Sequence, residues 1–429
     1  MTNSELRSID KKGYTLHIID SKKFKTIHLT AKFRTALTRD MITKRALLPF
    51  VLQQGSEDYP TANEFRRALD QLYGATYSMD GAKKGEQHVL TARMTLANPT
   101  FLATDENILK EGLTFFKQTL LKPKLVNQQF DPKIVKKEKQ TLKQKIAAIV
   151  DDKMHYANVR LVDEMCQNEP YQVHVHGYEE DLDGINGENL YQYYSSILRN
   201  DLLDIYVLGD LSSIDVEELI ADMFDREPTN QQKQQHIPKG KTIKETAEVI
   251  EEQSVQQAKL HLGFRTHTHF SDSDYPALQV FNGIFGAFPS SKLFLNVREK
   301  HSLAYYASSQ FESHKGLLFV YSGIAPKDYE QAKTIILEQM EAMTNGDFEE
   351  EQIEDAKKQI MNQYKETLDN PFGIIEMMYN QRVAGTSRSA EELLVKINEV
   401  DKESIIKMAN KIKLDTIYLL TANGGQTDE

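Results

Sequence analysis

The sequence predicts an α+β fold of two homologous domains, each a mostly antiparallel sheet flanked by helices. Its 429 residues are enough for two hydrophobic cores. Two stretches of the first half have counterparts in the second: HLTAKFRTALT at 28–38 resembles HLGFRTHTHFS at 261–271, and residues 130–152 resemble 348–370. The offset of roughly 220–230 residues is too long for a solenoid repeat and is typical of a duplicated domain.

A polar stretch, REPTNQQKQQHIPKGKTIK at 226–244, lies between the two halves. It is rich in Gln and carries both Pro and Gly, which is the composition of a linker. We therefore expect an N-terminal domain over residues 1–225, a linker over 226–244 and a C-terminal domain over 245–429.

The first elements follow from hydrophobic periodicity. Alternating apolar and polar residues predict strands at 14–20 and 26–35. The stretch TKRALLPFVLQQG at 43–55 predicts a buried helix, with a kink or a late start at Pro49, because proline cannot donate to residue 45. Asn63 is the candidate N-cap of a short amphipathic helix. Strands at 74–80 and 87–96 should pair antiparallel, and a helix should follow at 106–120.

A longer helix is predicted from Phe130 to about Asp152, with Pro132 in its first turn. One face is strongly basic, and the simpler interpretation is a solvated surface, with a ligand-facing patch as the alternative. Its lysines are Lys133, Lys136, Lys137, Lys139, Lys143 and Lys145. Further along, we expect a helix at 188–198, a buried strand at 202–208 and a helix at 215–224.

Composition restricts the class of function. The net charge of −11 argues against a nucleic-acid or membrane-surface partner, since phosphate binding needs a basic face. No apolar run approaches the roughly 20 residues of a membrane span. The chain has one cysteine, Cys166, which we expect in a core, and no apolar segment near its start. A cytoplasmic protein is the expectation.

Two strong hydrogen-bond donors stand close together in the second half. In GAFPSSKLFLNVREKHSLAYYASS at 286–309, Arg298 falls near a predicted helix end and Tyr305 near the start of a predicted strand. Such an arrangement can bring both side chains toward one point. A guanidinium and a phenol together suit a carbonyl or carboxylate oxygen.

At this point the sequence resembles the pitrilysin/insulinase family of zinc metallopeptidases, in particular half-length members without the zinc motif. The resemblance covers almost the whole chain. It is carried by SSKLFLNVREKHSLAYYAS, by NEFRRALDQLYGATYS at 63–78, by NEPYQVHVHGYEEDLDGI at 168–185, by IYVLGD at 205–210 and by the duplicated layout. The resemblance implies a pitrilysin or mitochondrial-processing-peptidase-like fold, and it implies that Arg298 and Tyr305 bind the substrate backbone.

The resemblance also implies where a zinc site should be. The family places His-x-x-Glu-His on a helix of the first domain, with a further Glu on the long helix downstream. Carried over, these positions fall on Ala46, Pro49, Phe50 and Lys145, while Glu138 keeps the family's preceding Glu. None of these four side chains can bind zinc or activate a water molecule. We therefore expect no catalytic residue, no metal and no cofactor.

Half-length members of the family work as pairs of chains around a peptide chamber. The resemblance therefore implies a non-catalytic, substrate-binding subunit of a heterodimeric zinc peptidase, whose homologous partner chain supplies zinc and general base. Such a chain would be inactive alone and would contribute to peptidase activity only with that partner. In isolation it could form a homodimer. The alternative is a peptidase-derived scaffold or peptide-binding protein with no proteolytic role.

Two histidine pairs offer a weaker metal signal. His174 and His176 lie on one side of an extended segment, and His267 and His269 repeat the pattern. A structural role is favoured for both pairs, because no third and fourth ligand can be identified nearby. The acidic run Asp347–Glu351 is expected to start a helix and needs no ligand.

Overall fold

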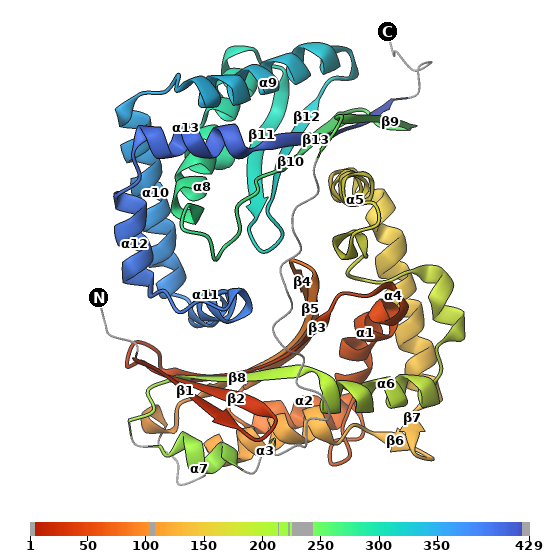
Figure 1. The fold of residues 1–429 in the computed structure, drawn as a ribbon. Helices are drawn as coiled ribbons and strands as arrows, with labels where there is room; N and C mark the ends of the chain where they lie inside the picture. The colour runs from red at the N-terminus through yellow and green to blue at the C-terminus, as the bar shows by residue number, and fades with distance from the viewer. Residues whose placement is uncertain (1–4, 103–107, 213, 222–223, 225–242, 423–429) are drawn as a thin grey trace. The chain divides into compact units, whose positions relative to one another are not determined.

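A computed structural model describes the chain except residues 1–4, 103–107, 213, 222–223, 225–242 and 423–429 (Figure 1). The chain divides into two compact units, one of Met1–Ala148 with Val173–Gln235 and one of Ile149–Gln172 with His236–Glu429. Nearly all of the predicted linker at 226–244 lies outside the described residues, so the domain boundary stays a prediction. Each unit contains one large sheet with helices, and the predicted α+β class is confirmed.

The first unit is built on a six-stranded sheet in the order β1-β2-β8-β3-β5-β4. Neighbouring strands are antiparallel, except that β2 and β8 run parallel. The predicted strands at 14–20 and 26–35 and the predicted antiparallel pair are all present. The strands are β1 Glu5–Lys11, β2 Tyr14–Asp20, β3 Thr26–Ala36, β4 Thr76–Lys84, β5 Gln87–Ala97 and β8 Leu202–Gly209.

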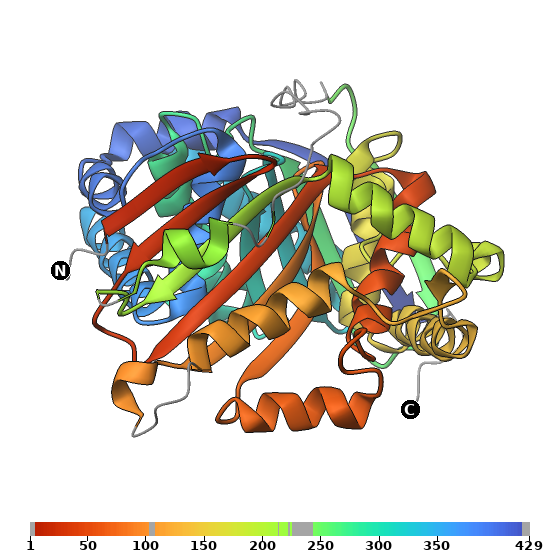
Figure 2. The same ribbon diagram turned by 90° about the horizontal axis from the view of Figure 1, so that it is seen from below.

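Helices pack on this sheet through one large apolar cluster. In Figure 2, α3 lies across the sheet, and it contacts β5. Phe65 of α2 packs against Phe115 of α3, with ring centroids 4.9 Å apart. The helices are α1 Arg39–Leu52, α2 Ala62–Gln71, α3 Ile108–Leu121, α4 Pro132–Asp151, α6 Gly187–Asn200 and α7 Val216–Ala221, with the short hairpin β6 Leu125–Val126 and β7 Gln129–Phe130 after α3.

Two details of these helices differ from expectation. Helix α1 does not start late at Pro49: it begins at Arg39, and Pro49 lies in its last turn, where only one backbone hydrogen bond is lost. The N-cap of α2 is Thr61, not Asn63. The reason is the capping box: Thr61 accepts from the Glu64 amide, and the Glu64 carboxylate accepts from the Thr61 amide.

The second unit repeats the strand order of the first. Its five-stranded sheet runs β11-β12-β10-β13-β9, which corresponds to β4-β5-β3-β8-β2, and its one parallel pair, β9 with β13, occupies the place of β2 with β8. The duplication that the sequence indicates is therefore visible as repeated topology. The strands are β9 Ala247–Gln253, β10 Ala258–Arg265, β11 Ala304–Glu312, β12 Leu317–Ile324 and β13 Lys413–Ala422.

The two faces of this sheet are covered by different elements. Helix α5 (Lys153–Met165) packs on β10 and β13, and Gly263 leaves room for it, because a Cβ there would lie 2.6 Å from Met165 Sδ. Cys166 is buried in this cluster, as predicted for a core residue. The other face carries the larger core. The remaining helices are α8 Tyr275–Asn282, α9 Tyr329–Asn345, α10 Glu350–Leu368, α11 Pro371–Ala384, α12 Ala390–Asn398 and α13 Lys402–Lys411.

The predicted role of the acidic run 347–351 is confirmed, because it leads into α10, where Glu349 forms a capping box with Gln352. Among the described residues, no helix has both the length and the apolar character that a bilayer crossing requires.

A buried ion cluster attaches the α5 segment to the second sheet. Arg265 Nε donates to Asp415 Oδ2 at 2.7 Å, and Nη2 donates to Glu169 Oε1 at 2.6 Å and to the Met165 carbonyl at 2.7 Å. Burial raises the pKa of Glu169, but the hydrogen bonds from Arg265 and Lys315 outweigh it and hold that pKa below its usual value. Residues 149–172 therefore belong to the second unit through charge as well as packing.

Replacing Arg265 by Met should lower the free energy of unfolding by about 3–5 kcal/mol, because Asp415 would remain buried beside no cation. Urea unfolding followed by circular dichroism measures this. The matched control is Lys358→Met on the exposed surface of α10, which should change stability by less than about 0.5 kcal/mol. A loss below about 1 kcal/mol for Arg265→Met would show that the cluster contributes little.

Two buried histidines should make the fold sensitive to acid. Burial lowers the pKa of His28 to about 4 and that of His261 to about 3. Below about pH 6.5 the unfolded chain takes up protons at these sites that the folded chain excludes, so stability falls as pH falls toward the folded pKa values. Each histidine contributes a slope of up to about 1.4 kcal/mol per pH unit.

Urea unfolding between about pH 7 and about pH 5 tests this dependence. His261→Leu should flatten the profile by about 1 kcal/mol per pH unit. A His261→Leu profile parallel to that of the unmodified chain would contradict the assignment.

Candidate functional site

The helix that carries three of the four predicted zinc-motif positions is held firmly at its C-terminal end. Gln53 follows the last turn of α1, and its Nε2 donates to the Pro49 carbonyl at 2.7 Å and to the Met79 carbonyl at 3.1 Å. The Met79 amide in turn donates to Gln53 Oε1 at 3.2 Å. These bonds tie the helix end to β4. They compensate for the backbone hydrogen bond that is lost because Pro49 has no N–H.

The structure brings two of the predicted zinc-motif positions together. Lys145 on α4 places its Nζ 5.6 Å from the ring centroid of Phe50 on α1, which is a cation–π contact. Ala46 lies one helical turn before Phe50 and is buried, as is Pro49. Phe50 is half-buried and Lys145 is exposed.

These side chains do not fit a zinc ion. Ala and Phe have no lone pair to donate, Pro has no acid–base function, and the Lys145 ammonium would repel a cation. In addition, no group of three or more His, Cys, Asp or Glu side chains with metal-site geometry occurs within the described part of the chain. These four residues therefore cannot support a metal-dependent reaction step.

Glu138, the acidic residue on α4 that the family resemblance singled out, is buried. Lys137 Nζ lies 3.1 Å from its Oε1. The lysines around it behave as a solvated surface, which favours the simpler interpretation of the basic face. Lys143 pairs with Glu179 at 2.7 Å, and Lys139 donates to the Ile185 carbonyl at 2.9 Å.

Arg298 and Tyr305 lie on adjoining elements of the second unit. Arg298 belongs to η5 (Phe294–Lys300), a helical turn with π-type hydrogen bonding, and η5 packs against the first residues of β11, which contain Tyr305. The ladder between β11 and β12 shifts register between Ala304 and Tyr306, so Tyr305 is the extra residue of a β-bulge. The helix end and the strand start that the sequence predicts for this segment are both present.

Both donors point away from the core. The Tyr305 side chain is 74% exposed and the Arg298 side chain 44% exposed. Arg298 lies over the ring of Phe294 at 4.7 Å, and its only described carboxylate neighbour is Glu299, at 3.7 Å. In a regular strand Tyr305 would point to the same face as Ala307 and Ser309, which are buried. The bulge breaks this alternation, so the strand itself turns Tyr305 toward solvent.

The two histidine pairs have structural surroundings. His174 stacks on Tyr178 with centroids 4.9 Å apart. His267 adopts a left-handed backbone conformation with φ of 52°. His269 Nδ1 lies 3.6 Å from Asp272 Oδ2. Neither pair gathers further ligands among the residues that the structure describes.

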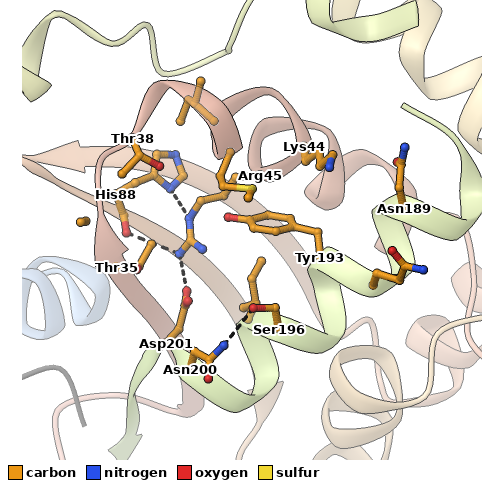
Figure 3. A pocket seen from close by; sticks show the side chains of 15 residues that line it. Thr35, Thr38, Lys44, Arg45, His88, Asn189, Tyr193, Ser196, Asn200 and Asp201 are labelled. Carbon is orange, nitrogen blue, oxygen red and sulfur yellow. Dashed lines mark hydrogen bonds and ion pairs between the residues drawn. The ribbon is translucent and has the colours of Figure 1, made fainter. Parts of the chain in front are cut away.

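The first unit contains a cavity of about 460 Å³ between α1, α6 and the ends of β3 and β5, which the sequence pattern did not predict (Figure 3). At its wall lies Arg45, which is 2% exposed. Arg45 Nε donates to His88 Nδ1, and Nη2 donates to the Phe33 carbonyl and pairs with Asp201 Oδ2, each at 2.7 Å. The available signal was an arginine directly before the apolar run Ala46–Leu52, but its partners are distant in sequence.

The charges of this cluster are fixed by their neighbours. Burial lowers the pKa of Arg45, but Asp201 and Tyr193 outweigh it and the pKa stays above its usual value, so the guanidinium is charged. Burial, with the charge of Arg45, holds the pKa of His88 well below its usual value, so that imidazole is neutral. Burial raises the pKa of Tyr193.

Comparison with known proteins gives consistent results. Residues 184–360 match the family described as peptidase M16 inactive domain. The chain is 46% identical over 413 residues to a probable inactive metalloprotease, YmfF, of Bacillus subtilis strain 168, covering 96% of this chain and 97% of that protein.

Two solved structures show the same fold over the whole chain. A conserved protein from Enterococcus faecalis V583 is 34% identical, with a TM-score of 0.90, and the match covers 98% of this chain and 99% of that one. A peptidase M16 inactive domain from Pseudomonas fluorescens is 16% identical, with a TM-score of 0.82. The match covers 99% of this chain and 100% of that one.

The assignment of the zinc-motif positions can be tested by restoring them. The chain as it stands should retain far less than one zinc after dialysis, whereas the triple variant Ala46→His, Phe50→His, Lys145→Glu should retain about one, because positions 50 and 145 already face each other. Metal analysis measures both. The control variant Ala46→His, Phe50→His alone should bind more weakly. Zinc retained by the unmodified chain, or none by the triple variant, would contradict the assignment.

Proposed function

The chain belongs to the peptidase M16 family as an inactive member, and from that premise we propose that it is the substrate-binding subunit of a heterodimeric zinc peptidase. In this role the chain would not carry out the chemistry. A homologous partner with an intact zinc motif would supply the metal and the general base, and this chain would hold the peptide.

The observation that carries the proposal is the contrast between two sets of positions. The zinc-motif positions hold an aliphatic, a proline, an aromatic and a cationic residue, and the Phe50–Lys145 contact fills the place with a stable pair. Arg298 and Tyr305, in contrast, remain exposed on adjoining elements. An exposed guanidinium and an exposed phenol keep hydrogen-bond donors available for a ligand.

The chemistry of the two donors indicates what they would bind. A charged guanidinium and a phenol hydroxyl can both donate to one carbonyl oxygen of an extended peptide. Holding the peptide in register beside the partner's metal would lower the entropic barrier of hydrolysis, and a donor aimed at the scissile carbonyl would stabilise the oxyanion that develops there. Peptide anchoring in trans is therefore a contribution to rate even though this chain has no zinc.

A scaffold or peptide-binding protein without a proteolytic role is the competing function. It would need neither Arg298 on η5 nor Tyr305 at the bulge of β11, which is why we favour the peptidase subunit. The proposed compartment is the cytoplasm.

The test begins with co-purification from the native cell and identification of bound chains by mass spectrometry. With the zinc-bearing partner in hand, Arg298→Ala and Tyr305→Phe should each reduce peptide turnover by the pair about tenfold or more, without dissociating the two chains. Turnover and sedimentation are measured on the same samples.

Matched controls are Arg66→Ala and Tyr73→Phe, which make the same chemical changes at exposed positions of the first unit and should leave turnover unchanged. If the heterodimer forms but turnover does not respond to Arg298→Ala or Tyr305→Phe, the anchoring role is wrong. If only scaffold-like complexes without peptidase activity are found, the competing function replaces the proposed one.

A further inference from the structure

The cavity beside Arg45 has the dimensions of a small-molecule site. Its volume of about 460 Å³ lies within the roughly 300–1,000 Å³ that is usual for such sites, and it would hold far more than a single water. Helix α1 forms one wall and α6 the opposite wall, with the ends of β3 and β5 between them (Figure 3). The lining includes none of the four predicted zinc-motif positions.

A buried cationic donor at this cavity has an unmet hydrogen bond. Arg45 Nε and Nη2 are engaged by His88, Phe33 and Asp201, but Nη1 has no hydrogen-bond partner of acceptable geometry among the described residues. The Tyr193 hydroxyl lies within reach of the guanidinium and raises the pKa of Arg45 by its charge and by a hydrogen bond, but it cannot satisfy both N–H groups of Nη1. Leaving a buried charged donor unpaired is destabilising, so an acceptor in the cavity would stabilise the protein.

The charge balance of the lining favours an anion. Two cations, Lys44 and Arg45, line the cavity with one carboxylate, Asp201, which leaves an excess of one positive charge. His88 is neutral, as its accepting Nδ1 shows. A metal cation would meet this excess charge and is disfavoured, whereas a carboxylate could accept from Arg45 Nη1 at depth and from the half-buried Lys44 nearer the opening.

The remaining lining is uncharged and combines polar side chains with the apolar residues Ala36, Met41, Ile42 and Ile197. Ser196 and Asn200 of α6 hydrogen-bond to each other at 2.9 Å at the edge of the cavity, and Thr35 and Thr38 face it from the end of β3 and the start of α1. Amide and hydroxyl groups of this kind pair with amide or hydroxyl groups of a ligand rather than with hydrocarbon.

We propose that this cavity binds a small organic carboxylate of amino-acid or dipeptide size, with its carboxylate on Arg45 and Lys44 and its polar groups along α6. The site is independent of the proposed peptidase role: it requires no partner chain, and its ligand is bound by the isolated protein. Water alone is the competing occupant.

Matched probes separate these occupants. N-acetyl-L-alanine carries the carboxylate, and N-acetyl-L-alaninamide has nearly the same shape without the charge. Calorimetric titration and saturation-transfer NMR of the full chain should show saturable binding of the acid and about tenfold weaker binding of the amide, a difference of about 1.4 kcal/mol.

Variants then locate the site. Ser196→Leu should abolish binding by filling the cavity, while Ser195→Leu, the same change at the neighbouring α6 position outside the lining, should not. Lys44→Met should weaken binding about two- to fivefold, because its side chain is only half-buried. Arg45→Lys should remove the preference for the acid over the amide. If Arg45→Lys does not fold, Ser196→Leu still tests whether the ligand binds in this cavity. Circular dichroism and the melting temperature confirm that each variant is folded.

Three results would overturn the proposal. One is the absence of saturable binding of the acid, which would leave water as the occupant. Another is equal binding of acid and amide, which would exclude a carboxylate site. The last is unchanged binding by Ser196→Leu, which would place the ligand elsewhere.

Discussion

A buried guanidinium holds α1 to the sheet of the first unit, and the features described for that unit depend on it. Arg45 connects the helix to β3 through the Phe33 carbonyl, to β5 through His88, and to Asp201 directly before β8. Removing a charge from water costs several kcal/mol, and only several well-formed hydrogen bonds and a paired carboxylate repay it. The helix is therefore held at one orientation, which directs Phe50 toward Lys145 and gives the cavity one of its walls.

The second unit uses the same physical device at a different place. Arg265, at the end of β10, binds Asp415 of β13 and Glu169 beyond α5. One buried cation thus joins three segments that are far apart in sequence. In each unit the charge cluster lies near the central strand, and the apolar cluster on the sheet supplies the bulk of the stabilisation while the charges select the arrangement.

The predicted zinc-motif positions hold side chains that are compatible with one another without a metal. A zinc site without zinc would leave imidazoles and carboxylates close together with unmet hydrogen bonds and repelling charges. Here an ammonium lies over an aromatic ring, and a proline occupies the last helical turn at little cost. The surface of α1 and α4 needs no ion to be stable. The donors of η5 and β11, in contrast, are exposed.

Much of this protein follows from its sequence. The alternation at 14–20 and 26–35, the repeat of HLTAKFRTALT in HLGFRTHTHFS, and the proline at the start of α4 each depend on neighbouring residues, so local pattern predicts them and, through repetition, the α+β class and the duplicated topology. The absence of metal donors at Ala46, Pro49, Phe50 and Lys145 is likewise a property of residue types. The bulge that exposes Tyr305 depends on pairing between strands, which is why pattern alone did not predict it.

Only the tertiary structure decided which distant residues meet. The N-cap of α2 required the geometry of Thr61 with Glu64, and the attachment of residues 149–172 to the second sheet required Arg265 to find Glu169. The cavity beside Arg45 requires residues 88, 193 and 201 to converge on one helix. Periodicity records which face of a segment is apolar, but it carries no information about the partner that a buried charge finds across the fold. That partner is set by packing, because a buried charge is tolerated only where the folded chain places its hydrogen-bond acceptors.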